Sequence, residues 1–218
     1  HTVGDILEEP FIVQNIGDSA YRKQRVRALL DVVGLPARST TRYPFEFSGG
    51  QRQRIGIARS IALNPRLIIC DEPVSALDVS IQSQILNLLI ELQQEFSLSY
   101  LFIAHDLAVV KHISDRMAIM YLGKIVESGV SDEIYRHAQH PYTQSLISAI
   151  PIPDPHNKSD RQIITGDVPS PIDPPSGCAF HPRCPKAQDT CKNLAPSLID
   201  RVNTTSTACH LILEPPAI

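Results

Sequence analysis

The chain has 218 residues, a formal net charge of −3, and 43% hydrophobic and 20% charged residues. This length suits one hydrophobic core, or one core with an appendage. The slight acidity gives no basis for nucleic-acid binding, which usually requires a basic surface. No run of 18 apolar residues occurs, so no membrane-spanning helix is predicted. The chain begins at His1 with no charged and apolar leader, so we predict no secretory signal and expect the gene product to extend further upstream.

The first two thirds of the chain predict alternating helices and strands. The expected helices show apolar residues at helical spacing and cover residues 3–13, 19–33, 48–63, 81–96 and 107–114. The expected strands are short apolar runs at residues 67–70, 100–104, 117–121 and 125–128, the last two joined by a Gly-Lys turn. This alternation predicts an α/β fold with a mostly parallel sheet. Ligands of such sheets bind at the carboxyl ends of the strands, where Asp71, Glu72 and His105 fall.

The composition changes near residue 140. Thirteen of the 18 prolines lie from Pro141 to Pro216, and four of the five cysteines lie from Cys178 to Cys209. We therefore expect an irregular, loop-rich extension after the regular domain.

The segment Phe47-Ser48-Gly49-Gly50-Gln51 is the first candidate site. A serine and two glycines at a helix start leave several backbone N–H groups open to a phosphate, with the positive end of the helix dipole behind them. A helix-capping serine with a flexible entry is the simpler interpretation of Ser-Gly-Gly taken alone.

Three further segments carry candidate catalytic residues. Asp71 and Glu72 follow the apolar run 67–70. Two carboxylates at the end of a strand suit the binding of Mg²⁺ and the polarisation of a water. The alternative interpretation is a strand that simply enters a polar turn. Ser75-Ala76-Leu77-Asp78 also fits an ordinary helix start capped by Asp78. His105 follows an apolar strand, where a histidine is more often structural than catalytic.

In this order and spacing, the four segments resemble the ABC ATPase family. Ser48, Gly49, Gly50 and Gln51 match its signature loop, Asp71 and Glu72 match its Walker B aspartate and catalytic glutamate, residues 75–78 match its D-loop, and His105 matches its switch histidine. The resemblance covers residues 1 to about 130 and implies a partial ABC ATPase domain.

The resemblance implies a mechanism in which two such domains enclose two ATP molecules. Asp71 would hold Mg²⁺ through water, Glu72 would orient the attacking water, and His105 would contact the γ-phosphate. Ser48 and Gly50 would reach the nucleotide of the opposite domain, and Asp78 would link the two sites. However, no G-x-x-x-x-G-K-[ST] segment occurs, so we expect the chain to be a fragment that lacks the Walker A and Q-loop and is inactive alone.

The C-terminal part resembles the extension of dipeptide and oligopeptide importer ATPases, through His140-Pro141-Tyr142-Thr143 and the segment 177–185, and the segments 46–58 and 101–107 resemble the second, F-type, ATPase of that system. This implies a subunit on the cytoplasmic face of the plasma membrane. Its implied partners are a second ABC ATPase, two transmembrane permease subunits and an extracytoplasmic peptide-binding protein. Related importers of nickel, glutathione or other small solutes, a non-transport ABC ATPase, and a metal-binding interaction module stay open as alternatives.

Cys178, Cys184, Cys191 and Cys209 form the pattern C-x5-C-x6-C-x17-C. Clustered thiols in a reducing compartment indicate a metal rather than disulfides, although the close pairs of common zinc modules are missing. In some importers of the family the matching cysteines hold a [4Fe–4S] cluster, and zinc or reduced thiols without a metal stay open. We therefore expect three segments: a helical part (1–46), the second half of the ATPase domain (47–130), and the importer extension (131–218).

Overall fold

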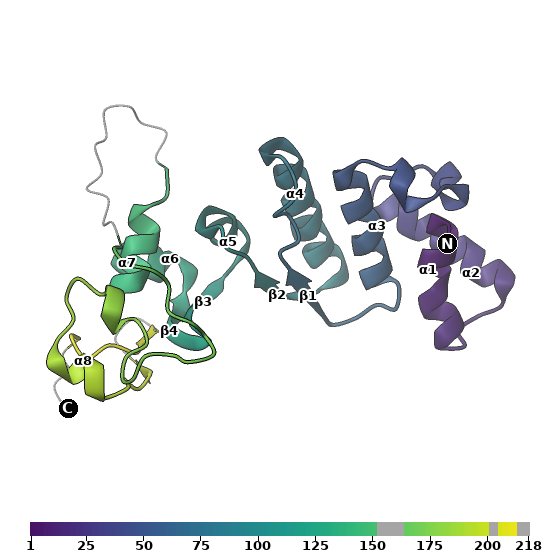
Figure 1. Cartoon of the computed structure of the whole chain (residues 1–218). Coiled ribbons are helices and arrows are strands. Elements are labelled where there is room, and N and C mark those ends of the chain that lie inside the picture. The colour runs from purple at the N-terminus through teal and green to yellow at the C-terminus, as the bar shows by residue number, and fades with distance from the viewer. Residues whose placement is uncertain (152–163, 201–204, 213–218) are drawn as a thin grey trace. The chain divides into compact units, whose positions relative to one another are not determined.

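The structure is a computed structural model that describes residues 1–151, 164–200 and 205–212 (Figure 1). It divides into two compact units, His1–His105 and Asp106–Ile218, which are treated separately below. The parts of the predicted extension at residues 152–163, 201–204 and 213–218 lie outside the described residues. The motif-based limits at residues 46 and 130 stay a prediction.

Three α-helices form one end of the first unit: α1 (Val3–Val13), α2 (Ser19–Val32) and α3 (Gly49–Ile61). Each begins at a side chain that accepts a backbone N–H, from Thr2, Asp18 and Ser48 respectively, which satisfies one of the unpaired donors of the first turn. Two 3-10 turns, Ala37–Thr41 and Pro44–Glu46, lead from α2 to α3. The core between these helices consists of fully buried apolar side chains, among them Val3, Leu7, Phe11, Leu30 and Ala58.

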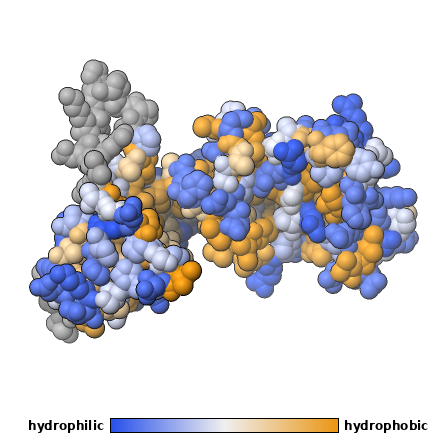
Figure 2. All heavy atoms as spheres, in the orientation of Figure 1, coloured by the Kyte–Doolittle hydropathy of each residue, from blue (hydrophilic) through white to orange (hydrophobic). Residues whose placement is uncertain are grey.

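Strands β1 (Leu67–Asp71) and β2 (Ser99–Ile103) pair in parallel, as the crossover through α4 (Val79–Phe96) requires. The Tyr100 hydroxyl donates to the Leu89 carbonyl of α4 (2.9 Å), so one face of the strand pair lies against this helix. The other face exposes four apolar side chains: Leu67, Ile69, Leu101 and Ile103. The runs predicted to be buried strands are therefore covered on one face only. Figure 2 shows hydrophobic surface beneath this strand pair and at the end of α1.

The second unit is built on an antiparallel sheet in the order β3-β4-β6-β5, from β3 (Arg116–Tyr121), β4 (Lys124–Val130), β5 (Ile199–Asp200) and β6 (Ser206–Thr207). Its helices are α5 (Leu107–Ile113), α6 (Ser131–His137), α7 (Pro141–Ser148) and α8 (Asp189–Asn193), with a 3-10 turn at His181–Arg183. The extension predicted to be irregular thus supplies two strands and several short helices.

The β3–β4 hairpin differs from the prediction in its turn. Leu122 and Gly123 both have positive φ (44° and 73°), whereas Lys124 already pairs with Tyr121. The turn residues are therefore Leu-Gly rather than Gly-Lys, because a two-residue hairpin turn that matches the strand twist needs positive φ at both central positions.

A buried carboxylate joins the elements of the second unit. Glu127 of β4 is fully buried and accepts the backbone N–H groups of Gln139 (2.8 Å) and His140 (3.1 Å), just before α7. It pairs across the sheet with Thr207 of β6. Burial raises the pKa of the Glu127 carboxyl, and the hydrogen bonds from the two backbone N–H groups partly oppose this. The side chain of Glu127 therefore ties β4 to the backbone just before α7, while the backbone of the same residue pairs with β6.

The two sequence motifs of the extension meet beside this carboxylate. Pro141 begins α7, and His140 caps it by accepting the Tyr142 N–H at Nδ1 (3.1 Å). Phe180, which is 1% exposed, packs edge-on against Tyr121 of β3, with ring centroids 5.2 Å apart, and contacts Tyr142 and His140. The motifs at residues 140–143 and 177–185 therefore form one aromatic core with the hairpin.

Acid is expected to weaken this core through His140. Burial lowers the pKa of its imidazole to about 4, from an ordinary 6.5. Between pH 6.5 and 4, His140 is protonated in the unfolded chain but not in the folded chain. The free energy of unfolding therefore falls as the pH drops from 6.5 to 4, by up to roughly 3 kcal/mol. Hydrogen exchange of β4 and α7 amides, corrected for the intrinsic rate at each pH, measures this loss.

The control is His140→Asn, which keeps a capping acceptor but does not titrate in this range. Glu127, with its raised pKa, contributes in the opposite direction, since its folded form binds more protons between pH 4.5 and its folded pKa. The difference between the two proteins isolates His140, and equal pH dependences would contradict the prediction.

Candidate functional site

Ser48 lies at the exposed start of α3. Its hydroxyl accepts the Gln51 N–H (3.3 Å), and the Gln51 side chain accepts the Ser48 N–H (3.1 Å), a capping box. Phe47, 4% exposed, anchors the segment in the core, and Arg52 donates to the Phe47 carbonyl (2.6 Å). The N–H groups of Gly49 and Gly50 belong to the first turn, whose donors have no partner within a helix. The serine is thus a helix cap, and the turn behind it still offers donors to an anion.

The parallel strand edge brings Glu72 and His105 together. Asp71 ends β1 opposite Ile103, the last residue of β2, and the Glu72 N–H donates to the Ile103 carbonyl (2.9 Å). Glu72 has a φ of +46°, and its Oε1 lies 3.2 Å from Nδ1 of His105. The three side chains are exposed, as residues that contact a bound molecule must be. A left-handed φ at a non-glycine residue is costly, and such strain concentrates at functional sites.

Asp78 caps α4, as the simpler interpretation of its segment predicted. Its Oδ1 accepts the Ile81 N–H (3.0 Å) and the Ser80 hydroxyl (2.7 Å), and these bonds lower the pKa of the exposed carboxyl. Asp78 is therefore ionised at neutral pH. Its second oxygen atom receives neither of these two bonds.

Two glycines bring the segment at residue 48 against the segment at residue 78. A Cβ atom on Gly49 would lie 3.1 Å from Cδ2 of Leu77, and one on Gly50 would lie 2.5 Å from Cγ2 of Ile81. Side chains at these positions would separate α3 from the start of α4. The need for glycine therefore arises from packing as well as from access to the backbone.

Gly50→Ala is expected to lower the free energy of unfolding of the first unit by about 1–3 kcal/mol through this clash. Gly56→Ala is the matched control, because Gly56 is exposed on the same helix with nothing within 4 Å of the added atom. It should stabilise the unit by about 0.5–1 kcal/mol through helix propensity. Ile81→Ala should relieve the Gly50→Ala defect. Urea unfolding of the variants measures these differences, and equal effects of the two glycine substitutions would refute the steric cause.

The site residues fit a magnesium nucleotide. Magnesium takes few protein carboxylates and completes its shell with waters and phosphate oxygens, and Asp71 and Glu72 offer exposed carboxylates at one strand end. The first turn of α3 offers backbone donors of the kind that bind phosphate.

The cluster site predicted at the four cysteines has no support among the described residues. Burial raises the pKa values of Cys178, Cys184 and Cys209, and neighbouring cysteines raise them further, so the thiols lie in one region of the second unit. Yet among the described residues, no three or more His, Cys, Asp or Glu side chains are grouped so that they could hold a metal ion. The expected [4Fe–4S] cluster therefore has no support from the geometry.

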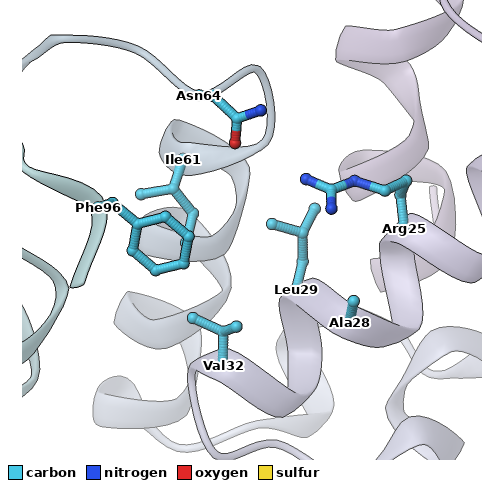
Figure 3. Close-up of a pocket in the computed structure, with 7 residues that line it drawn as sticks. All are labelled: Arg25, Ala28, Leu29, Val32, Ile61, Asn64 and Phe96. Atoms are coloured by element: carbon cyan, nitrogen blue, oxygen red, sulfur yellow. The ribbon is translucent and has the colours of Figure 1, made fainter.

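A shallow hollow on the first unit is separate from these residues. It lies between α2, the end of α3 and the end of α4, and Figure 3 shows the Arg25 side chain across from Phe96 and Asn64. The Arg25 Nε atom is buried and makes no hydrogen bond within the described part of the chain. None of the predicted site residues lines this hollow.

Comparison with known families agrees with both parts of the chain. The ABC transporter family matches residues 2–75, and the C-terminal region of oligopeptide/dipeptide transporters matches residues 126–191. Oligopeptide transport ATP-binding protein AppF of Bacillus subtilis is 52% identical over 212 residues, which cover 96% of this chain and 64% of the relative. OppF of Escherichia coli is 56% identical over 200 residues, which cover 90% of this chain and 60% of the relative. The chain is a homologue of oligopeptide transport ATP-binding proteins.

This homologue spans about three fifths of the length of the curated relatives that it matches. Solved structures agree on the fold. An inward-facing ABC transporter of the metal-chelate type matches with a TM-score of 0.59 and 28% identity, over 69% of this chain and 59% of that one. A dimeric bacterial ABC transporter cassette matches with a TM-score of 0.53 and 29% identity, over 60% of this chain and 57% of that one. The chain thus has the fold of a partial ABC ATPase domain. Within the described residues, no helix is long and apolar enough to cross a membrane.

Several residues that build the site could not be found from the sequence motifs. Leu77 and Ile81 contact the glycines, and Gln82 binds the turn before α4, but each looks like an ordinary residue of a helix start. Gln82 lies four residues after the capping Asp78, a spacing that places its side chain near the turn before α4. The hydrogen bonds that it makes to this turn are seen only in the structure.

Proposed function

We propose that this chain is part of a subunit that hydrolyses ATP with Mg²⁺ to drive the import of oligopeptides. The observation that carries the proposal is the 3.2 Å contact between Glu72 and His105 at the carboxyl edge of two parallel strands. A carboxylate beside an imidazole at this edge can orient a water while the imidazole contacts the terminal phosphate. Asp71 supplies a carboxylate for magnesium next to them.

The remaining site residues act on a second nucleotide in this proposal. Ser48, Gly49, Gly50 and Gln51 present the first turn of α3 to the phosphates bound by an opposing ATPase subunit, and Asp78 links the two sites. The proposed partners are that second subunit, two membrane-spanning permease subunits and an extracytoplasmic peptide-binding protein, with this chain on the cytoplasmic face of the membrane. Support comes from relatives named for oligopeptide transport and from the matched C-terminal region. Dipeptides are a further substrate class that the name of this region suggests.

A hybrid protein tests the proposal. These 218 residues replace the matching segment of the Bacillus subtilis relative, and the hybrid is produced in cells that lack that relative. It is expected to hydrolyse ATP and to restore uptake of labelled oligopeptides. ATP hydrolysis with uptake of nickel or glutathione instead would favour the alternative importers, and absence of ATP hydrolysis would overturn the proposal.

A further inference from the structure

Gln82 makes two hydrogen bonds to the turn that precedes α4. From the first turn of the helix, its Nε2 donates to the carbonyls of Val74 (3.0 Å) and Leu77 (3.1 Å). These two carbonyls bracket Ser75 and Ala76. The side chain is half-buried and comes from α4, so it fastens the turn to the helix.

Besides these two bonds, the turn is held by Val74, which is buried (4% exposed), and by the Ser75 hydroxyl, which donates to the Glu72 carbonyl (3.1 Å). Ser75, Ala76 and Asp78 are exposed, and the internal bonds from Ser75 N–H to Glu72 (3.3 Å) and from Leu77 N–H to Val74 (3.2 Å) are long. Beyond the buried Val74, the conformation of residues 75–78 depends largely on hydrogen bonds that can open locally. An amide that binds carbonyls at both ends of the turn therefore has a large share in fixing it.

The same turn contacts the start of α3. Leu77 fills the space over Gly49, and Ile81, next to Gln82, fills the space over Gly50. The closeness of both contacts means that a shift of Leu77 or Ile81 must displace the glycines or open a gap. The position of Ser48 is therefore coupled sterically to the turn that Gln82 holds.

We propose that Gln82 is a positioning residue that fixes residues 74–78 and, through Leu77 and Ile81, the start of α3. It touches neither the nucleotide nor the reacting atoms. The catalytic consequence rests on the proposed function, whereas the structural role does not.

The chemistry of the side chain determines the variants. A neutral amide offers two N–H donors to two carbonyls, while a carboxylate of the same shape offers none and repels them. Gln82→Glu removes the interaction with almost no change in volume, and Gln82→Arg restores N–H donors. Gln84→Glu is the matched control, since Gln84 is exposed on the same helix and the change in charge is the same.

Hydrogen exchange by mass spectrometry on the 218-residue chain tests the structural role. In Gln82→Glu, exchange at Ser75 and Leu77 and at Gln51 should rise about tenfold, the effect of losing one or two hydrogen bonds. Gln82→Arg should return it to within about threefold of the unchanged chain, and Gln84→Glu and the amides of α1 should not respond. An unchanged rate at Ser75 and Leu77, or an equal rise throughout the unit, would overturn the proposal.

The hybrid tests the catalytic consequence. Gln82→Glu should lower kcat for ATP about tenfold and leave KM within about twofold, because the residue aligns the site without contacting nucleotide. Gln82→Arg should recover kcat. If the hybrid without any substitution fails to hydrolyse ATP, that result counts against the proposed function alone. The hydrogen-exchange results do not depend on the proposed function. A normal kcat in Gln82→Glu would overturn the link to catalysis.

Discussion

Replacing Glu72 with glutamine in the hybrid is expected to lower the rate of ATP hydrolysis by roughly a hundredfold or more, the usual effect of removing a general base. The amide is close in shape to the carboxylate but cannot accept a proton from water. Its contact with His105, 3.2 Å in the unchanged chain, can persist as a neutral hydrogen bond. Binding of ATP is expected to continue, since Asp71 still offers a carboxylate to magnesium.

The measurement pairs steady-state hydrolysis with equilibrium binding of ATP to the same protein. Glu91→Gln is the control, an exposed glutamate of α4 far along the chain from the strand edge, and it should leave both quantities unchanged. Hydrolysis by Glu72→Gln at the rate of the unchanged hybrid would remove Glu72 from the catalytic role. Loss of binding together with hydrolysis would indicate a part in holding the nucleotide instead.

Glu127→Gln is expected to lower the free energy of unfolding of the second unit by about 2–3 kcal/mol, because a buried donor that loses its acceptor retains its desolvation cost. The carboxylate accepts the N–H groups of Gln139 and His140 with different oxygen atoms. An amide can accept only one of them, and its NH₂ group then faces the other donor.

Urea unfolding and the exchange rates of α7 and β6 amides measure this loss. Asp173→Asn, an exposed change with the same change in charge, should have an effect within about 0.5 kcal/mol of zero. A larger increase of exchange in α7 than in β6 is the specific result, since the Glu127 side chain ties β4 to the backbone just before α7. A stability equal to that of the unchanged chain would show that the other contacts of the aromatic core suffice.

Local sequence determined most of the elements. Helices α1 to α5 and the strands β1 and β2 form where apolar spacing and capping residues predicted them. The four motifs also predicted the ABC ATPase fold, which the solved structures confirm. These signals are local, because a cap acts within one turn and apolar spacing is set within one segment. The sequence also placed Asp71, Glu72 and His105 at one edge, because parallel strands end together.

Tertiary structure decided how distant segments meet. The sequence predicted an irregular tail because the strands β5 and β6 have two residues each and depend on tertiary pairing, β6 with β4 and β5 with β6. The burial of Glu127 is invisible in the sequence, since its donors lie 12 and 13 residues away. The spacing of the cysteines did not predict where their thiols lie, because the positions of Cys178 and Cys184 depend on packing in the core that contains Phe180. Motif order and spacing therefore predicted the resemblance to ABC ATPases and the candidate site residues, whereas the contacts of Gln82, Ile81 and Glu127 became visible only in three dimensions, because they depend on how separate elements pack.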